Sequence, residues 1–172
     1  INESIKLNDK YAVAAIYGYM ANTYADRYEF KKMLEVSERS LKLSEELQSN
    51  QMLASSLYNI AYANYFNGDN MAARQHINKA MEIAVKDSLK DELINIYTVL
   101  SYITAREGDF KTSLWAKQKS DSIQQALLNE QVIRTTTELE KKYESEKKDK
   151  QIILQRSQLE KRKVLNYILI GS

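Results

Sequence analysis

The chain is 172 residues long and contains no cysteine, no proline, four glycines and one histidine. The absence of cysteine excludes disulfides, thiolate metal sites and cysteine nucleophiles, and a single histidine cannot build a multi-histidine zinc site. The 25 basic and 23 acidic side chains give a net charge of +2, too even a balance to indicate nucleic-acid binding. Because strand-rich domains need glycine and proline at their turns, this composition predicts an all-α protein with long helices and short connections.

The amino-terminal segment 1–9 fits the end of a repeat helix. Shifted by 40 residues, positions 1–5 match 41–45 in the repeat described next. We therefore expect 1–9 to be the end of a preceding repeat helix, with further repeats upstream. No signal peptide or amino-terminal membrane segment is visible.

Three short polar breaks recur at an interval of 40 residues. They are Tyr28-Glu29-Phe30, Gly68-Asp69-Asn70 and Gly108-Asp109-Phe110. An amphipathic helical pattern precedes each break and another follows it, with small residues at matching places that let neighbouring helices approach closely. The period predicts three helix pairs over 10–49, 50–89 and 90–129. The recurring acidic residues Glu29, Asp69 and Asp109 are interpreted as turn or helix-cap residues.

This pattern resembles the tetratricopeptide repeat (TPR), in which a bulky residue, Leu-Gly and Tyr precede a turn and Ala, Phe and Ala follow it. The residues that carry the resemblance are Tyr17, Met20, Ala21, Tyr24, Ile60, Ala61, Gly68, Asp69, Ala73, Ala80, Gly108, Asp109 and Phe110. It implies a right-handed TPR-like α-solenoid of helix pairs whose first helices line a concave face.

The chain departs from the family at three kinds of position. Asn64 and Thr104 replace the family's tyrosine, and Ser37 and Lys117 replace the second aromatic. Glu45, Val85 and Gln125 replace the proline that usually ends the second helix. Since proline stops a helix, we expect each second helix to run on by one or two turns. That extension would explain a 40-residue period where the family usually has 34.

In the TPR family the concave groove binds peptides or partner helices, and its lining positions can be carried over one at a time. They fall on Gly18, Asn22, Asp26, Tyr58, Tyr62, Tyr65, Phe66, Thr98, Tyr102 and Arg106. Tyr58, Tyr62 and Phe66 are four residues apart and share one helix face. Tyr and Arg are enriched at binding hot spots, so the stripe predicts a peptide groove. The alternative is that it packs on the next repeat or on the carboxy-terminal helix.

Ten of the twelve tyrosines lie before residue 130. We expect most of these ten to belong to the core.

Residues 130–163 predict a long, charged connector helix that is coiled-coil-like. Val132, Leu139 and Ile153 fit one position of a seven-residue repeat, but Glu146 interrupts the seam. Three i,i+4 pairs are expected to support the helix locally: Glu138 with Lys142, Glu144 with Lys148, and Glu146 with Lys150. Such a helix suits a connector or a weak parallel homodimer, and a solvated helix of no special purpose is the alternative.

The chain ends in an apolar run, 164–170, that directly follows the basic cluster Lys161-Arg162-Lys163. A membrane span needs about 20 apolar residues. We interpret 164–172, beginning at Val164, as the start of a truncated transmembrane helix. The alternative is an apolar end that packs against the solenoid or another chain.

Repeats, a charged helix and a basic cluster entering an apolar run together resemble the sensor regions of bacterial membrane-bound signalling proteins of the two-component histidine kinase or helix-turn-helix regulator type. The resemblance implies a non-catalytic, periplasmic sensor domain with a peptide or protein partner. The basic cluster on the outer side opposes the positive-inside tendency, although long domains can cross regardless of flanking charge. The alternative function is a soluble cytoplasmic TPR scaffold that dimerises through its carboxy-terminal helix.

Catalysis has little support in the sequence. His76 has Arg74 and Lys79 nearby but no glycine-rich loop, acid pair or serine elbow, so we expect a surface or packing histidine. No phosphate-binding loop or metal-ligand spacing is present. We therefore expect no catalytic residue, no metal, no cofactor and no nucleic-acid partner. A helical enzyme would need convergent acid-base groups that the sequence does not show.

Overall fold

The computed structural model describes the backbone of residues 2–170 and the side chains of residues 9–164 and Asn166. The described residues form six helices: α1 (Asn2–Asp26), α2 (Phe30–Glu46), α3 (Asn50–Asn67), α4 (Asn70–Lys86), α5 (Lys90–Arg106) and α6 (Phe110–Ile170). They divide into two compact units, 1–125 and 126–172. The first unit contains α1 to α5 and the beginning of α6, and the second contains the rest of α6.

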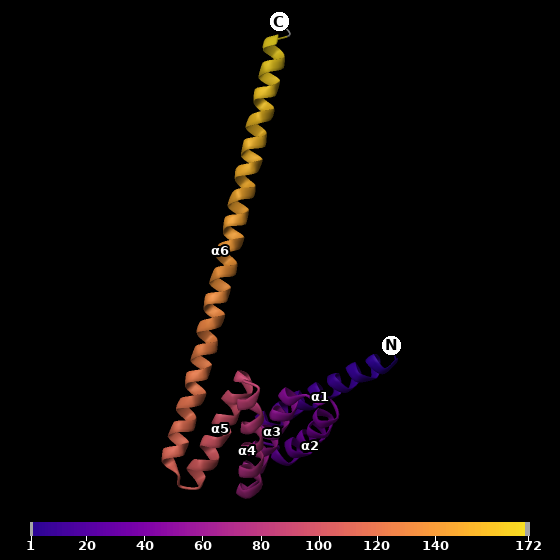
Figure 1. Cartoon of the computed structure of the whole chain (residues 1–172), viewed down its shortest axis with the longest axis vertical. Coiled ribbons are helices and arrows are strands. Elements are labelled where there is room, and N and C mark those ends of the chain that lie inside the picture. The colour runs from indigo at the N-terminus through magenta and orange to yellow at the C-terminus, as the bar shows by residue number, and fades with distance from the viewer. Residues whose placement is uncertain (1, 171–172) are drawn as a thin grey trace. The chain divides into compact units, whose positions relative to one another are not determined.

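The first unit is a solenoid of helix pairs. Figure 1 shows the helices of this unit stacked in chain order, with α3 in contact with both α2 and α4, and α5 in contact with α3 and α4. The pairs are α1 with α2, α3 with α4, and α5 with the first part of α6. This arrangement confirms the predicted all-α, TPR-like architecture.

Left-handed residues end the helices at repeating positions. Tyr28, Gly68 and Gly108 have φ angles of 59°, 90° and 82° and follow the first helix of each pair. Gln48 and Ser88, with φ of 51° and 54°, follow the second helices. A residue in this conformation lets the last carbonyl groups of a helix accept turn hydrogen bonds. The predicted breaks are therefore the turns inside the pairs.

Two of the three recurring acidic residues cap helices as predicted. Asp69 Oδ1 accepts a hydrogen bond from the Ala72 backbone N–H at 2.9 Å, and Asp109 Oδ1 accepts one from Thr112 at 3.0 Å. Glu29 makes no side-chain cap and instead forms an ion pair with Lys32. Glu29 nevertheless stands in the turn at the N-cap position of α2, as the interpretation of a turn or helix-cap residue requires, but without a side-chain cap bond.

Small residues hold the central helices close together. Ala73, Ala80 and Ala84 of α4 are fully buried against Ile96 and Ile103 of α5. Alanine lets the helix axes approach, and isoleucine fills the remaining space.

The contact between α2 and α3 combines apolar packing of Met33 and Val36 with Ala63 and hydrogen bonds between hydroxyl groups. Ser56 donates a hydrogen bond to Ser40 Oγ at 2.9 Å, and Ser44 Oγ donates to the Ser40 carbonyl at 2.7 Å. All three serines are buried. Each buried hydroxyl thus has a hydrogen-bond partner, as burial of a polar group requires.

The second helices of the first two pairs do not run on as expected, whereas α6 continues past Gln125 to Ile170. α2 ends at Glu46 and α4 at Lys86, one residue beyond Glu45 and Val85. The six residues by which the period exceeds the usual 34 are not all in the second helix. The two helices of a pair are similar in length, with 18 residues in α3 and 17 in α4. The missing proline therefore does not account for the period in the way we expected, because left-handed turn residues end α2 and α4 in its place.

The structure has no turn where the period would end a preceding repeat helix. α1 runs without interruption over 25 residues from Asn2 to Asp26. The expected segment 1–9 thus continues the first helix of the first pair in its described part.

Six of the ten tyrosines before residue 130 are half-buried and pack against the core, as expected for most of them: Tyr17, Tyr24, Tyr58, Tyr62, Tyr65 and Tyr97. All ten tyrosines before residue 130 have described side chains, and none of them is fully buried. Tyr19 and Tyr28 are 73% and 80% exposed. The fully buried positions are occupied by smaller residues, because closely approaching helices leave no room for a phenol ring whose hydroxyl needs a partner.

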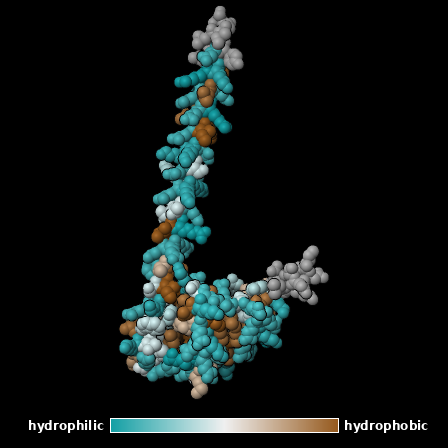
Figure 2. Space-filling model, viewed as in Figure 1, coloured by the Kyte–Doolittle hydropathy of each residue, from teal (hydrophilic) through white to brown (hydrophobic). Residues whose placement is uncertain are grey.

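The second unit is a single helix with exposed side chains. Figure 2 shows its surface as mostly hydrophilic with separate hydrophobic spots. Leu139 and Tyr143 of this helix are 61% and 68% exposed. At 3.6 residues per turn, Leu128, Val132, Leu139 and Tyr143 lie within roughly 60° of one another on one face. The helix continues through Asn129 without a break.

The local ion pairs of this helix differ from those expected. Glu138 accepts from Arg134 Nε at 3.0 Å and not from Lys142. Among the described residues, neither Glu144 with Lys148 nor Glu146 with Lys150 forms an ion pair. Water competes for each of these fully exposed groups, and such pairs are worth only a few tenths of a kcal/mol.

The end of the chain lies mostly outside the described side chains, so the interpretation of 164–172 as a membrane segment is not tested there. Within the described residues, no helix combines the length and apolar character needed to cross a membrane.

Candidate functional site on the concave face

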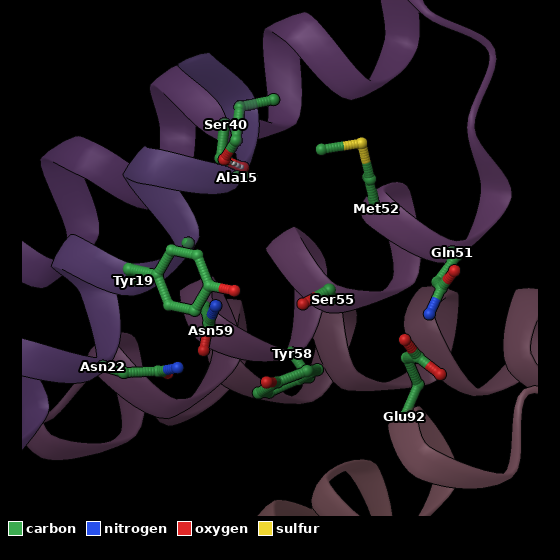
Figure 3. Close-up of a pocket in the computed structure, with 12 residues that line it drawn as sticks. Ala15, Tyr19, Asn22, Ser40, Gln51, Met52, Ser55, Tyr58, Asn59 and Glu92 are labelled. Atoms are coloured by element: carbon green, nitrogen blue, oxygen red, sulfur yellow. Dashed lines mark hydrogen bonds between the residues drawn. The ribbon is translucent and has the colours of Figure 1, made fainter. Parts of the chain in front are cut away.

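The first helices of the pairs carry two adjacent pockets. The first pocket has a volume of about 310 Å³ and lies mainly between α1 and α3 (Figure 3). Its lining residues are Ala14, Ala15, Gly18, Tyr19, Asn22, Ser40, Gln51, Met52, Ser55, Tyr58, Asn59 and Glu92.

The second pocket continues the first along the same surface. It has a volume of about 220 Å³ and is lined by Asn22, Ala25, Met33, Tyr58, Asn59, Tyr62, Asn95, Thr98, Val99 and Tyr102. Asn22, Tyr58 and Asn59 line both pockets, which therefore form one continuous concave face. We call this surface the concave face.

Glu92 is the one charged side chain among the residues that line these two pockets. The other polar lining groups are amides, hydroxyls and phenols, such as those of Asn22, Ser55 and Tyr102. This set can accept and donate hydrogen bonds and offers aromatic surface, but it contains no nucleophile paired with a base. Such groups can contact an extended or helical chain.

The structure places some of the predicted groove residues on the concave face. Asn22, Tyr58, Tyr62 and Tyr102 line the pockets, together with Gly18 and Thr98.

Asp26, Tyr65, Phe66 and Arg106 do not line either pocket. Asp26 is exposed at the end of α1. Tyr65 and Phe66 follow Tyr62, the last pocket residue of α3, and Arg106 follows Tyr102, the last pocket residue of α5.

The predicted stripe of aromatics belongs to a larger aromatic cluster. Phe66 stacks on Phe30 of α2, with ring centroids 4.2 Å apart and planes at 7°. Tyr62 meets Phe66 edge to face at 4.8 Å and lies 6.4 Å from Tyr102. The aromatic cluster consists of Tyr28, Phe30, Tyr62, Tyr65, Phe66 and Tyr102. The stripe thus contributes both to the pocket wall and to contacts between helix pairs.

Arg106 is occupied by contacts within the first unit. Its guanidinium lies over the Tyr65 ring, and one of its nitrogens donates to Asn70 Oδ1 at 3.1 Å. It also donates to the carbonyl oxygen of Tyr65. These contacts join the end of α5 to the end of α3 and the beginning of α4.

Two pocket tyrosines have perturbed acidity. Burial raises the pKa of Tyr58, and the nearby Glu92 carboxylate raises it further, although a hydrogen bond with Ser55 opposes the shift. Burial also raises the pKa of Tyr62, with the phenol of Tyr102 as the next contribution. Both phenols therefore stay neutral near pH 7 and act as hydrogen-bonding, aromatic walls.

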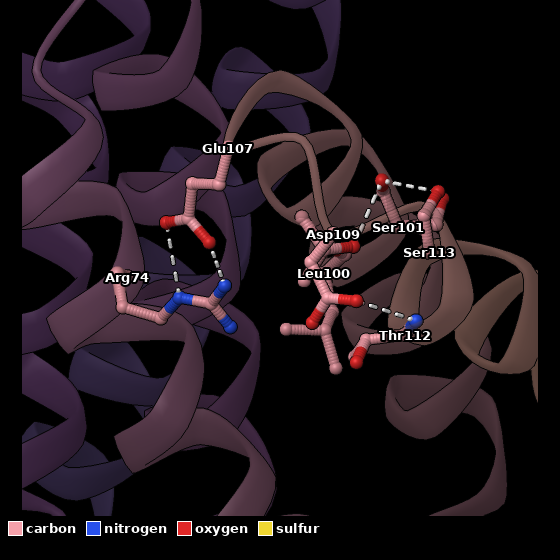
Figure 4. Close-up of polar contacts among 8 residues, drawn as sticks. Arg74, Leu100, Ser101, Glu107, Asp109, Thr112 and Ser113 are labelled. Atoms are coloured by element: carbon pink, nitrogen blue, oxygen red, sulfur yellow. Dashed lines mark hydrogen bonds and ion pairs between the residues drawn. The ribbon is translucent and has the colours of Figure 1, made fainter.

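Polar contacts fix α5 between its neighbours. Arg74 of α4 binds the Glu107 carboxylate through two guanidinium nitrogens, as Figure 4 shows. Ser113 Oγ at the beginning of α6 donates to the Ser101 carbonyl at 2.9 Å. A bidentate pair holds orientation as well as distance. These bonds position Tyr102 and Thr98 of α5 on the concave face.

Sequence reasoning missed several pocket residues. Glu92, Asn95, Ser55 and Gln51 lie one or two turns before the predicted groove positions on the same helix faces. Extending the predicted face back at i,i−3 and i,i−4 spacing would have found them. The burial of Glu92 has no sequence signal, because it depends on how α5 meets α3.

His76 of α4 lines a pocket of about 280 Å³ together with Glu45, Lys79 and Glu82. Its Nδ1 lies 2.7 Å from the Ala72 carbonyl oxygen in its own helix, and the ring is half-buried. Within the described residues, no group of three or more His, Asp or Glu side chains could hold a metal ion.

The stacked helix pairs and their concave face define the class of this protein as a TPR-like α-solenoid. Among solved structures, the chain is similar to the TPR domain of Arabidopsis FLU, with a TM-score of 0.57 and 15% sequence identity. The similarity covers 70% of this chain and 98% of that domain, and at this identity it shows the fold alone. No family model and no curated protein matches the chain.

Proposed function

We propose that the first unit is a non-catalytic protein-interaction domain that binds a peptide or a helix of a partner protein on its concave face. The observation that carries this proposal is the continuity of the two pockets, which share Asn22, Tyr58 and Asn59. The pockets combine aromatic walls with amide groups, and binding sites typically use few polar groups within a largely apolar surface. Polar amides can pair with the backbone of a bound chain, and tyrosines supply rigid contact area.

The experiment compares two asparagines on exposed helix faces. Asn22 lines both pockets, whereas Asn78 is exposed on α4 and lines neither. Immobilised protein is incubated with pools of random nonapeptides, and retained peptide is quantified by mass spectrometry. We expect Asn22→Arg to reduce retention at least about tenfold and Asn78→Arg to leave it unchanged. Equal retention by both variants would reject the concave face as the binding surface.

We further propose that this domain is the sensor region of a membrane-anchored bacterial signalling protein, with the domain in the periplasm. The support is the sequence arrangement together with the continuity of α6 from Phe110 to Ile170. Partner binding would change the packing of α5 on the first turns of α6 and so alter the pairing of α6 in a homodimer. Such relay requires two states that differ in affinity for the partner.

This finer proposal is tested on the gene with its native continuation. We expect the protein in the membrane fraction, and its first unit to be degraded by protease added to spheroplasts. Protection of the first unit in spheroplasts, or its recovery in the soluble fraction, would favour the cytoplasmic scaffold that dimerises through 130–163. The exposed apolar face of 128–143 is the observation that supports that second candidate.

A further inference from the structure

Glu92 is a carboxylate on the wall of the first pocket that has no partner among the described residues. The residue as a whole is 9% exposed, and no hydrogen bond or ion pair joins it to any described residue. Its oxygens remain in contact with solvent, which reaches them through the open pocket. A charged group with so little exposure gains from an opposite charge, because few water molecules can solvate it.

The carboxylate lies on the wall of the first pocket, as Figure 3 shows. In this view the Gln51 amide points toward the carboxylate, and Tyr58 lines the same pocket. Its electrostatic effect on the Tyr58 phenol is consistent with this proximity. All lining groups other than Glu92 are neutral, so no described side chain of the pocket balances its charge.

The position of Glu92 in the first turn of α5 does not explain its burial. Acidic residues near a helix amino terminus are stabilised by the helix dipole. Asp91 lies in the same turn and is exposed, so it can provide this stabilisation without being desolvated. Leu89, the N-cap residue of α5, has no side chain that could cap the helix. The Glu92 side chain forms no capping hydrogen bond with the backbone of Leu89 either.

We propose that the first pocket binds a cationic side chain, a lysine or an arginine, of the partner peptide. Glu92 accepts hydrogen bonds from the ammonium or guanidinium group, Tyr58 covers the aliphatic part and attracts the cation to its ring face, and the Gln51 amide oxygen accepts a further bond. This inference rests on the proposed function and adds the chemistry of the partner. A peptide that presents an acidic side chain at the same place is repelled, because neither pocket offers a cation.

The test uses peptide pools with one fixed residue. Nonapeptides carry lysine, arginine, norleucine or glutamate at the centre, and uncharged residues are randomised on both sides. The 172-residue wild-type protein is expected to retain the lysine and arginine pools about tenfold to hundredfold more strongly than the norleucine pool, the factor typical of a hydrogen bond to a charged group. The glutamate pool is expected to be retained least.

Two variants with the same change of charge separate a local from a long-range effect. Glu92→Gln is expected to bring the basic and norleucine pools within about twofold of each other, whereas Asp91→Asn keeps the full preference. A preference for basic pools that survives Glu92→Gln would overturn the inference. Retention of all pools without any preference in the wild type would also overturn it while leaving the proposed function standing. Retention of no pool above background would reject the proposed function itself.

A third variant tests the need for a cation without any peptide. Gln51 is exposed and points toward Glu92 in Figure 3, so Gln51→Lys supplies an ammonium group within the chain. We expect a higher melting temperature and a loss of preference for the basic pools. A melting temperature that does not rise, together with an unchanged preference, would contradict the inference.

Discussion

The Arg106 guanidinium lies 3.6 Å from the centroid of the Tyr65 ring and donates to the carbonyl oxygen of the same residue at 2.5 Å. One side chain of α5 thus contacts both the ring and the backbone at the end of α3. Arginine can stack on an aromatic ring and donate hydrogen bonds at the same time, because its charged group is planar. The residue expected to bind a partner is instead part of the contact between neighbouring helix pairs.

Arg106→Ala is expected to lower the free energy of unfolding by about 1–2 kcal/mol, because it removes a cation–π contact and two hydrogen bonds. Arg106→Lys should recover only part of this loss, since an ammonium group cannot combine the stack with the fork of donors. Urea unfolding measures both variants, with Arg27→Ala at the exposed end of α1 as the control. If the urea midpoint of Arg106→Ala is unchanged and peptide retention is weaker, Arg106 contacts the partner and does not stabilise the fold.

Two buried serines of α2 should respond in opposite directions to the same substitution. The Ser37 hydroxyl is buried with no hydrogen-bond partner among the described residues, whereas Ser40 Oγ accepts from Ser56 at 2.9 Å. Ser37→Ala is expected to raise the free energy of unfolding by about 1 kcal/mol, and Ser40→Ala to lower it by about as much. Thermal and urea unfolding provide the comparison. Equal effects of the two substitutions would mean that Ser37 has a partner such as a buried water molecule.

The left-handed turn residues predict a second pair of opposite effects. Gly108 has φ of 82° and Ser88 has φ of 54°, and only glycine adopts such angles without steric cost. Gly108→Ala is expected to destabilise the first unit by about 1 kcal/mol, and Ser88→Gly to stabilise it by about 0.5–1 kcal/mol. Differential scanning calorimetry should show a lower melting temperature of the first unit for Gly108→Ala and a higher one for Ser88→Gly. A stabilising Gly108→Ala would show that the turn can adopt another conformation.

Asp109 makes stability depend on pH in the acidic range. Its hydrogen bonds with the Thr112 side chain and backbone N–H hold the pKa of this carboxyl below its ordinary value of 3.8. A lowered pKa in the folded state stabilises the fold above the ordinary pKa, and this contribution is lost as pH falls through the folded value. Asp109→Asn keeps a capping acceptor but cannot titrate. The urea midpoint of the variant should therefore fall less steeply below about pH 4 than that of the wild type. Identical pH profiles would show that the cap does not act through its charge.

The exposed apolar face of the second unit predicts weak self-association. Leu139 and Tyr143 lie on this face and are largely exposed, whereas Thr137 lies elsewhere on the helix and bonds to the Ile133 carbonyl. Leu139→Glu should abolish any dimer seen by sedimentation equilibrium, because a charge replaces an apolar contact, and Thr137→Glu should not. A wild-type protein that stays monomeric at millimolar concentration would exclude the homodimer through 130–163.

The sequence contained enough information for the fold because its main signals are local. The breaks at 28–30, 68–70 and 108–110 mark turns through residues that can adopt left-handed angles or cap helices, and these depend only on neighbouring positions. Thr104, which stands where the TPR pattern has tyrosine, also makes a local contact. Its hydroxyl donates to the Leu100 carbonyl of the same helix at 2.8 Å. The length of α1 was not predicted, because the period suggests a turn near residue 8 that the chain does not make.

The candidate site was only partly predictable. The spacing of Asn22, Tyr58 and Tyr102 on successive first helices identified the concave face, since helical periodicity determines which residues share a face. The same spacing could not distinguish Tyr58, which lines a pocket, from Phe66, which stacks on Phe30. That difference depends on where each turn of α3 meets α2.

The sequence by itself thus determined that this protein is a series of helix pairs with a 40-residue period followed by a long charged helix, because composition, periodicity and turn residues act over a few positions along the chain. Only the tertiary structure decided which side chains contact one another. It placed Arg106 on Tyr65 and brought Glu92 to the wall of the first pocket without a partner among the described residues. Both outcomes follow from helix axes brought together by small residues distant in sequence, and such contacts have no signature along a single helix.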